Sequence, residues 1–137
     1  MKQYEGHTSW VLCFETYVTY DEAGKLKTNW LLSGSDDATI RIWDIESTKC
    51  LEKLIDHKNG ITCLAFAIQG LISSSYDHSL NNWTMSIIEK RVNEIRMMEA
   101  EDLLSRKMEA YNRFMEAKFG KKRGKKGKGK GKSKKKK

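Results

Sequence analysis

The sequence predicts an all-β domain made of two related units, followed by one long α-helix and a tail rich in lysine and glycine. Three observations lead to this prediction. Two stretches of the chain match each other at a constant spacing, residues 87–119 contain no proline or glycine, and the last 18 residues are almost entirely lysine and glycine. The predicted boundaries are residues 1–85, 86–119 and 120–137.

The two units are recognised by matching the chain against itself. Residues 31–45, LLSGSDDATIRIWDI, match residues 71–85, LISSSYDHSLNNWTM, at an offset of 40 and without a gap. Upstream, GHTSWVLCF at 6–14 matches the segment 56–66 at an offset of 50, which predicts a lengthened loop at residues 20–29 of the first unit. The paired residues are His7 with His57, Ser33 with Ser73, Ser35 with Ser75, Asp37 with Asp77, and Trp43 with Trp83.

Short strands are predicted within each unit. The segments WVLCFE, WLLSGS and TIRIWDI are short, rich in β-branched and aromatic residues, and bounded by turn-forming residues. Asp37 and Asp77 fall in tight connections between such strands, where a carboxylate accepts hydrogen bonds from backbone N–H groups and from a histidine.

These motifs resemble the WD-repeat family of β-propellers. The first unit has the family's Gly6-His7 pair and its closing Trp43-Asp44, whereas the second unit has Asp56-His57 and Trp83-Thr84 in their places. The fold class that the resemblance implies is a propeller fragment of about two blades. It also implies two structural, non-catalytic hydrogen-bonded tetrads: His7, Ser33 or Ser35, Asp37 and Trp43 in the first unit, and His57, Ser73 or Ser75, Asp77 and Trp83 in the second.

A serine, a histidine and an aspartate in one unit could also be read as a hydrolase triad. An enzyme needs one such site, whereas a network that fixes a blade recurs in every blade. The sequence also lacks a nucleophile elbow such as Gly-x-Ser-x-Gly. We therefore predict no catalytic residues and no enzymatic activity.

Two blades cannot close a propeller, which needs about four to eight. Residues 1–85 should therefore leave two apolar faces unpaired, and we expect them to be the C-terminal blades of a longer protein. The alternative is a short chain that completes its ring with copies or partners. In this family a strand from the N-terminal end commonly closes the last blade, so we expect a gap after Met85 that these 137 residues do not fill.

One long helix is predicted from residue 86. Ser86 and Glu89 have the spacing of a capping box, and Gly120 is a natural stop. The apolar residues form two stripes on opposite sides of the helix. The first, Ile88, Val92 and Ile95, should dock on the blades, and the second should bind a partner protein, although a solvated helix is the alternative. The predicted partner-binding face is Leu104, Met108, Tyr111, Phe114 and Met115, with Leu103 beside it.

The net charge of +8 is very unevenly distributed. Residues 120–137 hold 12 of the 26 Lys and Arg residues and no acid, so residues 1–119 carry 14 basic and 18 acidic groups. The tail should be disordered and should bind polyanions without sequence specificity, because it has no aromatic residue and one arginine. Its candidate binding residues are Lys121, Lys122, Arg123, Lys125, Lys126, Lys128, Lys130, Lys132, Lys134, Lys135, Lys136 and Lys137.

The sequence favours a non-catalytic scaffold that joins other protein subunits through its blades and helix. One alternative is an RNA-associated ribonucleoprotein or ribosome-assembly factor that acts through the tail. Another is a cilium- or cytoskeleton-associated protein whose tail contacts acidic tubulin tails. A nuclear-import signal, an anionic-membrane contact and a merely solubilising tail are also open.

The remaining predictions concern chemistry and location. Cys13, Cys50 and Cys63 match no zinc spacing and should be buried, reduced thiols. We expect no metal, cofactor or small-molecule substrate. Without a signal peptide or a membrane-spanning run, the protein should be intracellular: cytoplasmic or cytoskeletal, with a cilium possible and the nucleus or nucleolus as the alternative.

Overall fold

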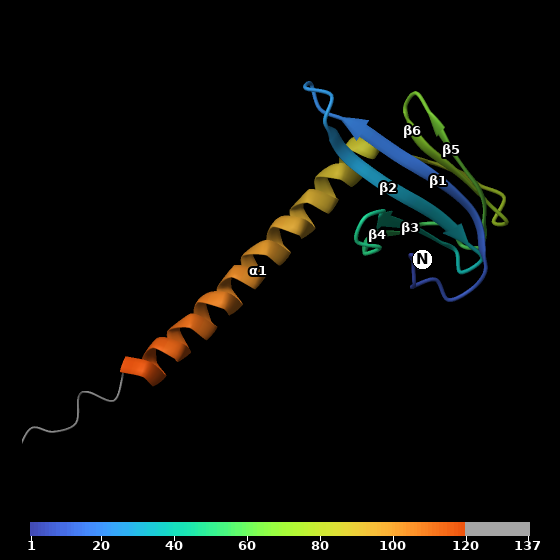
Figure 1. Cartoon of the computed structure of the whole chain (residues 1–137). Coiled ribbons are helices and arrows are strands. Elements are labelled where there is room, and N and C mark those ends of the chain that lie inside the picture. Colours follow the sequence, from blue (N-terminus) through green and yellow to red (C-terminus); the bar gives the residue numbers. More distant parts are fainter. Residues whose placement is uncertain (120–137) are drawn as a thin grey trace, which may run out of the picture. The chain divides into compact units, whose positions relative to one another are not determined.

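A computed structural model describes residues 1–119 of the chain. Two antiparallel sheets are followed by one helix, in agreement with the predicted fold class (Figure 1). The tail residues 120–137, with all the polyanion-binding positions predicted on them, lie outside the described residues. The strands are β1 (Val11–Tyr20), β2 (Leu26–Ser35), β3 (Thr39–Asp44), β4 (Cys50–Ile55), β5 (Ile61–Ala67), β6 (Gly70–Ser75) and β7 (Leu80–Trp83), and the helix is α1 (Met85–Phe119).

The first sheet has four strands in the order β1-β2-β3-β4. Its first hairpin is longer than the sequence predicted, because residues assigned to a loop at 20–29 continue both strands. Val18 pairs with Asn29, and Thr19 pairs with Thr28. The ten additional residues of the first unit therefore lengthen a hairpin, and the prediction of a long loop was wrong.

A compact turn closes this hairpin. The Asp21 carboxylate accepts hydrogen bonds from the backbone N–H groups of Ala23 and Lys25, at 3.0 and 2.8 Å. Gly24 has a φ of 73°, a conformation that costs glycine little. An aspartate that bonds its own turn and a glycine in the left-handed region are enough to reverse the chain here.

The second sheet has three strands in the order β5-β6-β7, so within the described residues β7 is an edge strand with β6 as its only neighbour. Its strands have the same register as the first sheet: Leu71 pairs with Trp83 as Leu31 pairs with Trp43. The two sheets are thus copies of one arrangement, and within residues 1–119 the second copy has no strand equivalent to β4.

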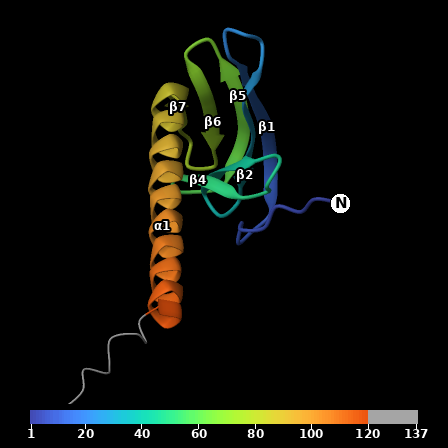
Figure 2. The same cartoon turned by 60° about the vertical axis from the view of Figure 1, so that its left-hand side comes forward.

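The sheets stack through β1 and β5, which contact each other (Figures 1 and 2). We call the surface of the first sheet that meets the second its core face; it carries Leu32, Gly34, Ile40 and Ile42. Its three large side chains are at most 1% exposed. A Cβ atom on Gly34 would lie 2.6 Å from Cγ2 of Ile61, so only glycine allows this close approach of the two sheets.

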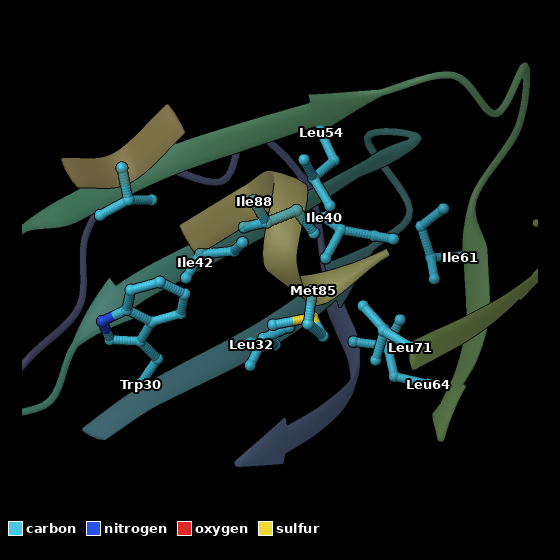
Figure 3. Packing of buried hydrophobic residues seen from close by; sticks show 11 residues of the cluster. Trp30, Leu32, Ile40, Ile42, Leu54, Ile61, Leu64, Leu71, Met85 and Ile88 are labelled. Carbon is cyan, nitrogen blue, oxygen red and sulfur yellow. The ribbon is translucent and has the colours of Figure 1, made fainter. Parts of the chain in front are cut away.

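The first turns of α1 complete the same core. Met85, Ile88 and Val92 are buried with residues of both sheets, and Figure 3 shows Met85 and Ile88 among Leu32, Ile40 and Ile42. Each fully buried aliphatic side chain contributes about 1.5–3 kcal/mol relative to an exposed one. Ile95, the third residue of the predicted docking stripe, is 39% exposed.

Thr84, and not Ser86, precedes the helix. The Thr84 carbonyl accepts hydrogen bonds from the N–H groups of Ile87 and Ile88, at 3.1 and 3.3 Å, and the helix begins at Met85. The predicted capping box between Ser86 and Glu89 was wrong, because the Glu89 carboxylate instead accepts a hydrogen bond from the Tyr17 hydroxyl. A tertiary contact therefore replaces a local one.

The three cysteines are free thiols, as predicted, but they are not all buried. Cys13 and Cys50 are half-buried, whereas Cys63 is exposed. Burial, and secondarily the neighbouring Cys63 thiol, raises the pKa of Cys13 to about 11, so this thiol stays protonated near neutral pH. The prediction was wrong for Cys63, which lies on a side of the second sheet that is exposed in the described part of the chain.

Candidate functional site

A chain of hydrogen bonds joins four side chains of the first sheet. The Trp43 indole N–H donates to Ser33 Oγ at 2.8 Å, and Ser33 Oγ lies 2.7 Å from His7 Nε2. His7 Nδ1 lies 2.9 Å from Oδ2 of Asp37. Every donor finds an acceptor if the serine hydroxyl donates to Nε2 and Nδ1–H donates to the carboxylate. The network ties the segment before β1 to the turn between β2 and β3.

The carboxylate at the end of this network is held in its charged form. Burial opposes ionisation of Asp37, but hydrogen bonds from the Thr39 hydroxyl, the Thr8 N–H and the His7 ring outweigh it. The Thr39 bond is 2.6 Å long and the Thr8 bond is 3.0 Å long. Together they hold the pKa of Asp37 well below its usual range.

The structure also decides which serine belongs to the network. Ser33 Oγ contacts both His7 and Trp43, whereas Ser35 Oγ accepts the N–H of Asp37 at 3.1 Å and lies 3.4 Å from the Ser9 carbonyl. Ser35 therefore fixes the turn itself. Ser33 is the serine that links the tryptophan to the histidine.

The second sheet repeats the whole arrangement. Trp83 Nε1 donates to Ser73 Oγ at 2.8 Å, which lies 2.8 Å from His57 Nε2, and His57 Nδ1 lies 3.0 Å from Oδ2 of Asp77. Hydrogen bonds from the Ser79 hydroxyl first, and then from the Lys58 N–H, hold the pKa of Asp77 well below its usual range. Ser75 fixes the turn as Ser35 does.

Each network has one further member that was not predicted from the sequence. Thr39 and Ser79 each donate a 2.6 Å hydrogen bond to the neighbouring carboxylate, on Asp37 and Asp77. The repeat could have identified them, because the offset of 40 aligns Thr39 with Ser79 and both side chains carry a hydroxyl group. Two residues after the aspartate, a hydroxyl side chain reaches back to it across the turn.

The surface of the first sheet opposite the core face is largely uncovered; we call it the open face. Its hollow has a volume of 320 Å³, and its lining includes Val11, Phe14, Leu31 and Trp43. Val11 is 54% exposed and Phe14 is 71% exposed. Tyr4 covers one side, with its ring packed edge-on against Trp43 at a centroid distance of 5.9 Å. The open face is thus an exposed apolar surface beside the first hydrogen-bond network.

The first turns of α1 are also fixed by polar contacts. The Tyr17 hydroxyl donates to Glu89 Oε1 at 2.8 Å, and Arg91 pairs with Glu52 of β4 at 3.3 Å. Burial and the Glu89 carboxylate raise the pKa of Tyr17 to about 12. Tyr17 also packs against Trp30 and Phe66. The lengthened β1-β2 hairpin therefore contributes to the surface that receives the helix.

The helix from Arg96 onward forms a separate unit and is described by itself. Its predicted partner-binding residues are exposed: Leu104 by 62%, Met108 by 53%, Tyr111 by 56% and Phe114 by 58%, whereas Met115 is half-buried. On the other side of the helix, charged residues form pairs four positions apart. These are Asp102 with Arg106 at 2.9 Å and Glu109 with Arg113 at 3.4 Å.

The described part of the chain, residues 1–119, has no group of three or more His, Cys, Asp or Glu side chains that could hold a metal ion. None of its helices is long and apolar enough to cross a membrane.

Stacked antiparallel sheets with a Trp–Ser–His–Asp network in each define a pair of propeller-type blades. The chain belongs to the WD40 family: the family described as "WD domain, G-beta repeat" matches residues 1–44 and 48–84. This confirms the resemblance seen in the sequence.

Similar proteins include several curated WD-repeat proteins. The chain is 32% identical over 87 residues to an uncharacterised WD repeat-containing protein of Schizosaccharomyces pombe, covering 62% of this chain and 23% of that protein. It is 37% identical over 68 residues to the Polycomb protein esc of Drosophila melanogaster, covering 46% and 16%. Nuclear distribution protein PAC1 of Ajellomyces capsulatus is 36% identical over 74 residues, covering 53% and 16%.

Among solved structures, the computationally designed Ika4 protein matches with a TM-score of 0.46 and 26% identity, covering 60% of this chain and 45% of that one. The chain spans less than a quarter of the length of the three curated relatives described above.

Proposed function

We propose that the chain is a non-catalytic scaffold that binds another protein through the distal part of α1. The observation that carries the proposal is an apolar stripe made of exposed Leu104, Met108 and Tyr111 and half-buried Met115, with exposed Phe114 at its edge. Membership of a family built from repeated blades supports a role in assembly.

The spacing of the stripe fits a helical partner. Its residues follow one another at steps of four, three and four, which places them on one side of a helix. Apolar residues at this spacing form the seam of helix pairs and of helix-in-groove complexes. Charged pairs keep the opposite side in water, so one face of the helix is suited to a partner and the other to solvent.

The two Ser–His–Asp arrangements are better suited to structure than to catalysis. Each serine hydroxyl already joins a tryptophan to a histidine, and Ser73 is fully buried. The same bonds occur in both sheets at nearly equal lengths. A hydrolase triad would instead present its serine to substrate beside an oxyanion hole.

A quantitative pull-down with the full chain tests the helix proposal. We expect Leu104→Asp and Met108→Asp to release a bound protein that the parent chain retains, because each places a charge within the apolar seam. Ser105→Asp is the matched control, since it adds the same residue to the same helix outside the stripe. Equal retention of the partner by all variants would contradict the proposal, as would equal loss with the Ser105 control.

A second proposed function is polyanion binding by residues 120–137, which is favoured by their charge of +12 against −4 for residues 1–119. The alternatives are RNA and acidic protein tails. Fluorescence anisotropy would compare the full chain with a chain that ends at Phe119, using a labelled single-stranded RNA and a polyglutamate peptide. Binding that depends on the tail should weaken steeply with salt. Equal binding by the shortened chain would contradict a role for the tail.

A further inference from the structure

The apolar stripe on the distal part of α1 is symmetric about its own midpoint, which falls between positions 109 and 110. Leu104 and Met115 lie equally far from this midpoint, and so do Met108 and Tyr111. All four residues are on one side of the helix, and three of them are more than half exposed. Such a stripe can pack against a copy of itself that runs in the opposite direction, because a two-fold axis through the midpoint places residues at equal distances face to face.

Opposite charges continue the stripe on its two sides. Glu101 lies three positions before Leu104, and Lys118 lies three positions after Met115, so both extend the same side of the helix. These two charged residues are also equally far from the midpoint and are exposed. In an antiparallel pair of helices, Glu101 of each copy therefore faces Lys118 of the other. Two ion pairs would then border the apolar contact.

Neither of these charges has a partner along its own helix. Ion pairs within a helix join residues three or four positions apart, as Asp102 and Arg106 do at 2.9 Å. Glu101 has no basic residue at those distances, and Lys118 has no acidic one. The Lys118 ammonium group instead lies over the ring of Phe114, 5.5 Å from its centre. Both charges are therefore placed to pair with a second helix.

The residues that flank the stripe are compatible with the same arrangement. They are Ser105, Lys107, Asn112 and Phe114, of which Lys107 alone carries a charge. In an antiparallel pair, Lys107 of one copy lies near Phe114 of the other, where its aliphatic part covers the ring while its ammonium group stays in water. No two like charges face each other along these edges.

Charge disfavours a parallel pair of the same helices. A parallel pair would place Glu101 against Glu101 and Lys118 against Lys118, at the positions where the antiparallel pair has opposite charges. It would also bring together two segments 120–137, each with a charge of +12. The charges along the chain therefore select the antiparallel direction.

We propose that the partner of the stripe is the same stripe of a second copy of this chain, in an antiparallel pair of helices over residues 101–118. The inference rests on the proposed function, since it names the protein that the stripe binds. It involves only residues from Arg96 onward, which form a unit of their own. Four apolar residues from each copy make a small contact, so we expect a weak, reversible dimer.

The first test is the mass of the full chain, measured by sedimentation equilibrium over a range of concentrations. We expect an equilibrium between the 15.9 kDa chain and a dimer of twice that mass. Leu104→Asp should weaken dimerisation by about a hundredfold, because it places a carboxylate within the apolar contact in both copies. Ala110→Asp is the matched control, since it adds the same residue at an exposed position away from the stripe. It should leave the dissociation constant unchanged.

The ion pairs are tested by exchanging their charges. Glu101→Lys alone should weaken dimerisation by about tenfold, because two attractive contacts become repulsive. Adding Lys118→Glu to the same chain restores opposite charges in an antiparallel pair, so the double variant should dimerise like the parent. Neither substitution removes an ion pair within the helix, so the helix content measured by circular dichroism should not change. A double variant that dimerises no better than Glu101→Lys would overturn the proposal.

A disulfide cross-link reports the direction of the two helices. With dissolved oxygen as the oxidant, a mixture of Glu101→Cys and Lys118→Cys chains should form a disulfide between positions 101 and 118, identified by peptide mapping. Glu101→Cys should not link to itself, since its two copies lie about 25 Å apart in the antiparallel pair. A mixture of Arg106→Cys and Arg113→Cys is the control, because these positions are equally far from the midpoint but on the outer side. Linking of position 101 to itself, or equal linking in the control, would overturn the proposal.

The mass and the pull-down together separate this inference from the proposed function. A full chain that stays monomeric at about 1 mM would overturn the second copy as the partner. The proposed function would stand if Leu104→Asp nevertheless released a different protein in the pull-down, and it would fall with the inference if Leu104→Asp released none. Dimers that Leu104→Asp leaves intact would also overturn the inference, because they would form through another surface.

Discussion

Ser33→Ala should be one of the most damaging single-atom deletions in the first blade. Loss of the hydroxyl leaves the Trp43 indole N–H without its acceptor and His7 Nε2 without its partner, at sites where Ser33 is 6% exposed and Trp43 is 2% exposed. A buried polar group without a hydrogen bond costs about 1–3 kcal/mol. Two such groups, partly relieved by rearrangement, give a loss of about 2–4 kcal/mol in the free energy of unfolding.

Urea denaturation followed by tryptophan fluorescence measures this loss. With a slope of about 2 kcal/mol per molar urea, the midpoint should fall by about 1–2 M. Ser9→Ala is the control: it also removes a serine hydroxyl, but one that is exposed and makes a 3.3 Å hydrogen bond to Asp36. It should change stability by less than about 0.5 kcal/mol. Equal midpoint shifts in the two variants would refute the view that the network stabilises the blade.

Three further predictions follow from the same structure. Because the pKa of Asp37 is lowered in the folded state, the unfolded state binds more protons in acid. The free energy of unfolding should therefore fall as the pH drops below about 4, and it should fall less steeply in Asp37→Asn. Equal slopes of unfolding free energy against pH in the two proteins would contradict this. Val92→Ala should lower the free energy of unfolding, measured by chemical denaturation, by about 2 kcal/mol because Val92 is 1% exposed. Ile95→Ala should lower it by less than about 1 kcal/mol because Ile95 is 39% exposed. Tyr17 should ionise at a pKa of about 12 in ultraviolet titration, and Glu89→Gln should lower that pKa; an unchanged value would show that burial alone raises it.

The repeat in the sequence predicted the strands of both units well, because each pattern depends on residues that are near one another in the chain. Ser33 and Ser73 could not be separated from Ser35 and Ser75 in the same way. Side chains two residues apart point to the same face of a strand, so periodicity treats them alike. The choice depends on which hydroxyl the indole reaches from the neighbouring strand.

The errors share a physical cause. Residues 20–29 have the composition of a loop, but pairing across the hairpin places five of the ten in strands β1 and β2. Ser86 and Glu89 fit a capping box, but the Glu89 carboxylate accepts a hydrogen bond from Tyr17, which is more than 70 residues earlier in the chain. In each case a contact distant in the sequence overrode a local preference.

The sequence by itself determined the repeat, the candidate residues of each network with two serines left open, and the range of the helix, because spacing, turn residues and helix-forming residues act over short distances. Only the tertiary structure decided which serine bridges tryptophan and histidine, how far the first hairpin extends, and that Met85, Ile88 and Val92 are buried. It also separated the faces that are covered from those that are open. These depend on how two sheets and a helix pack together, and burial is a property of that packing and not of any one segment.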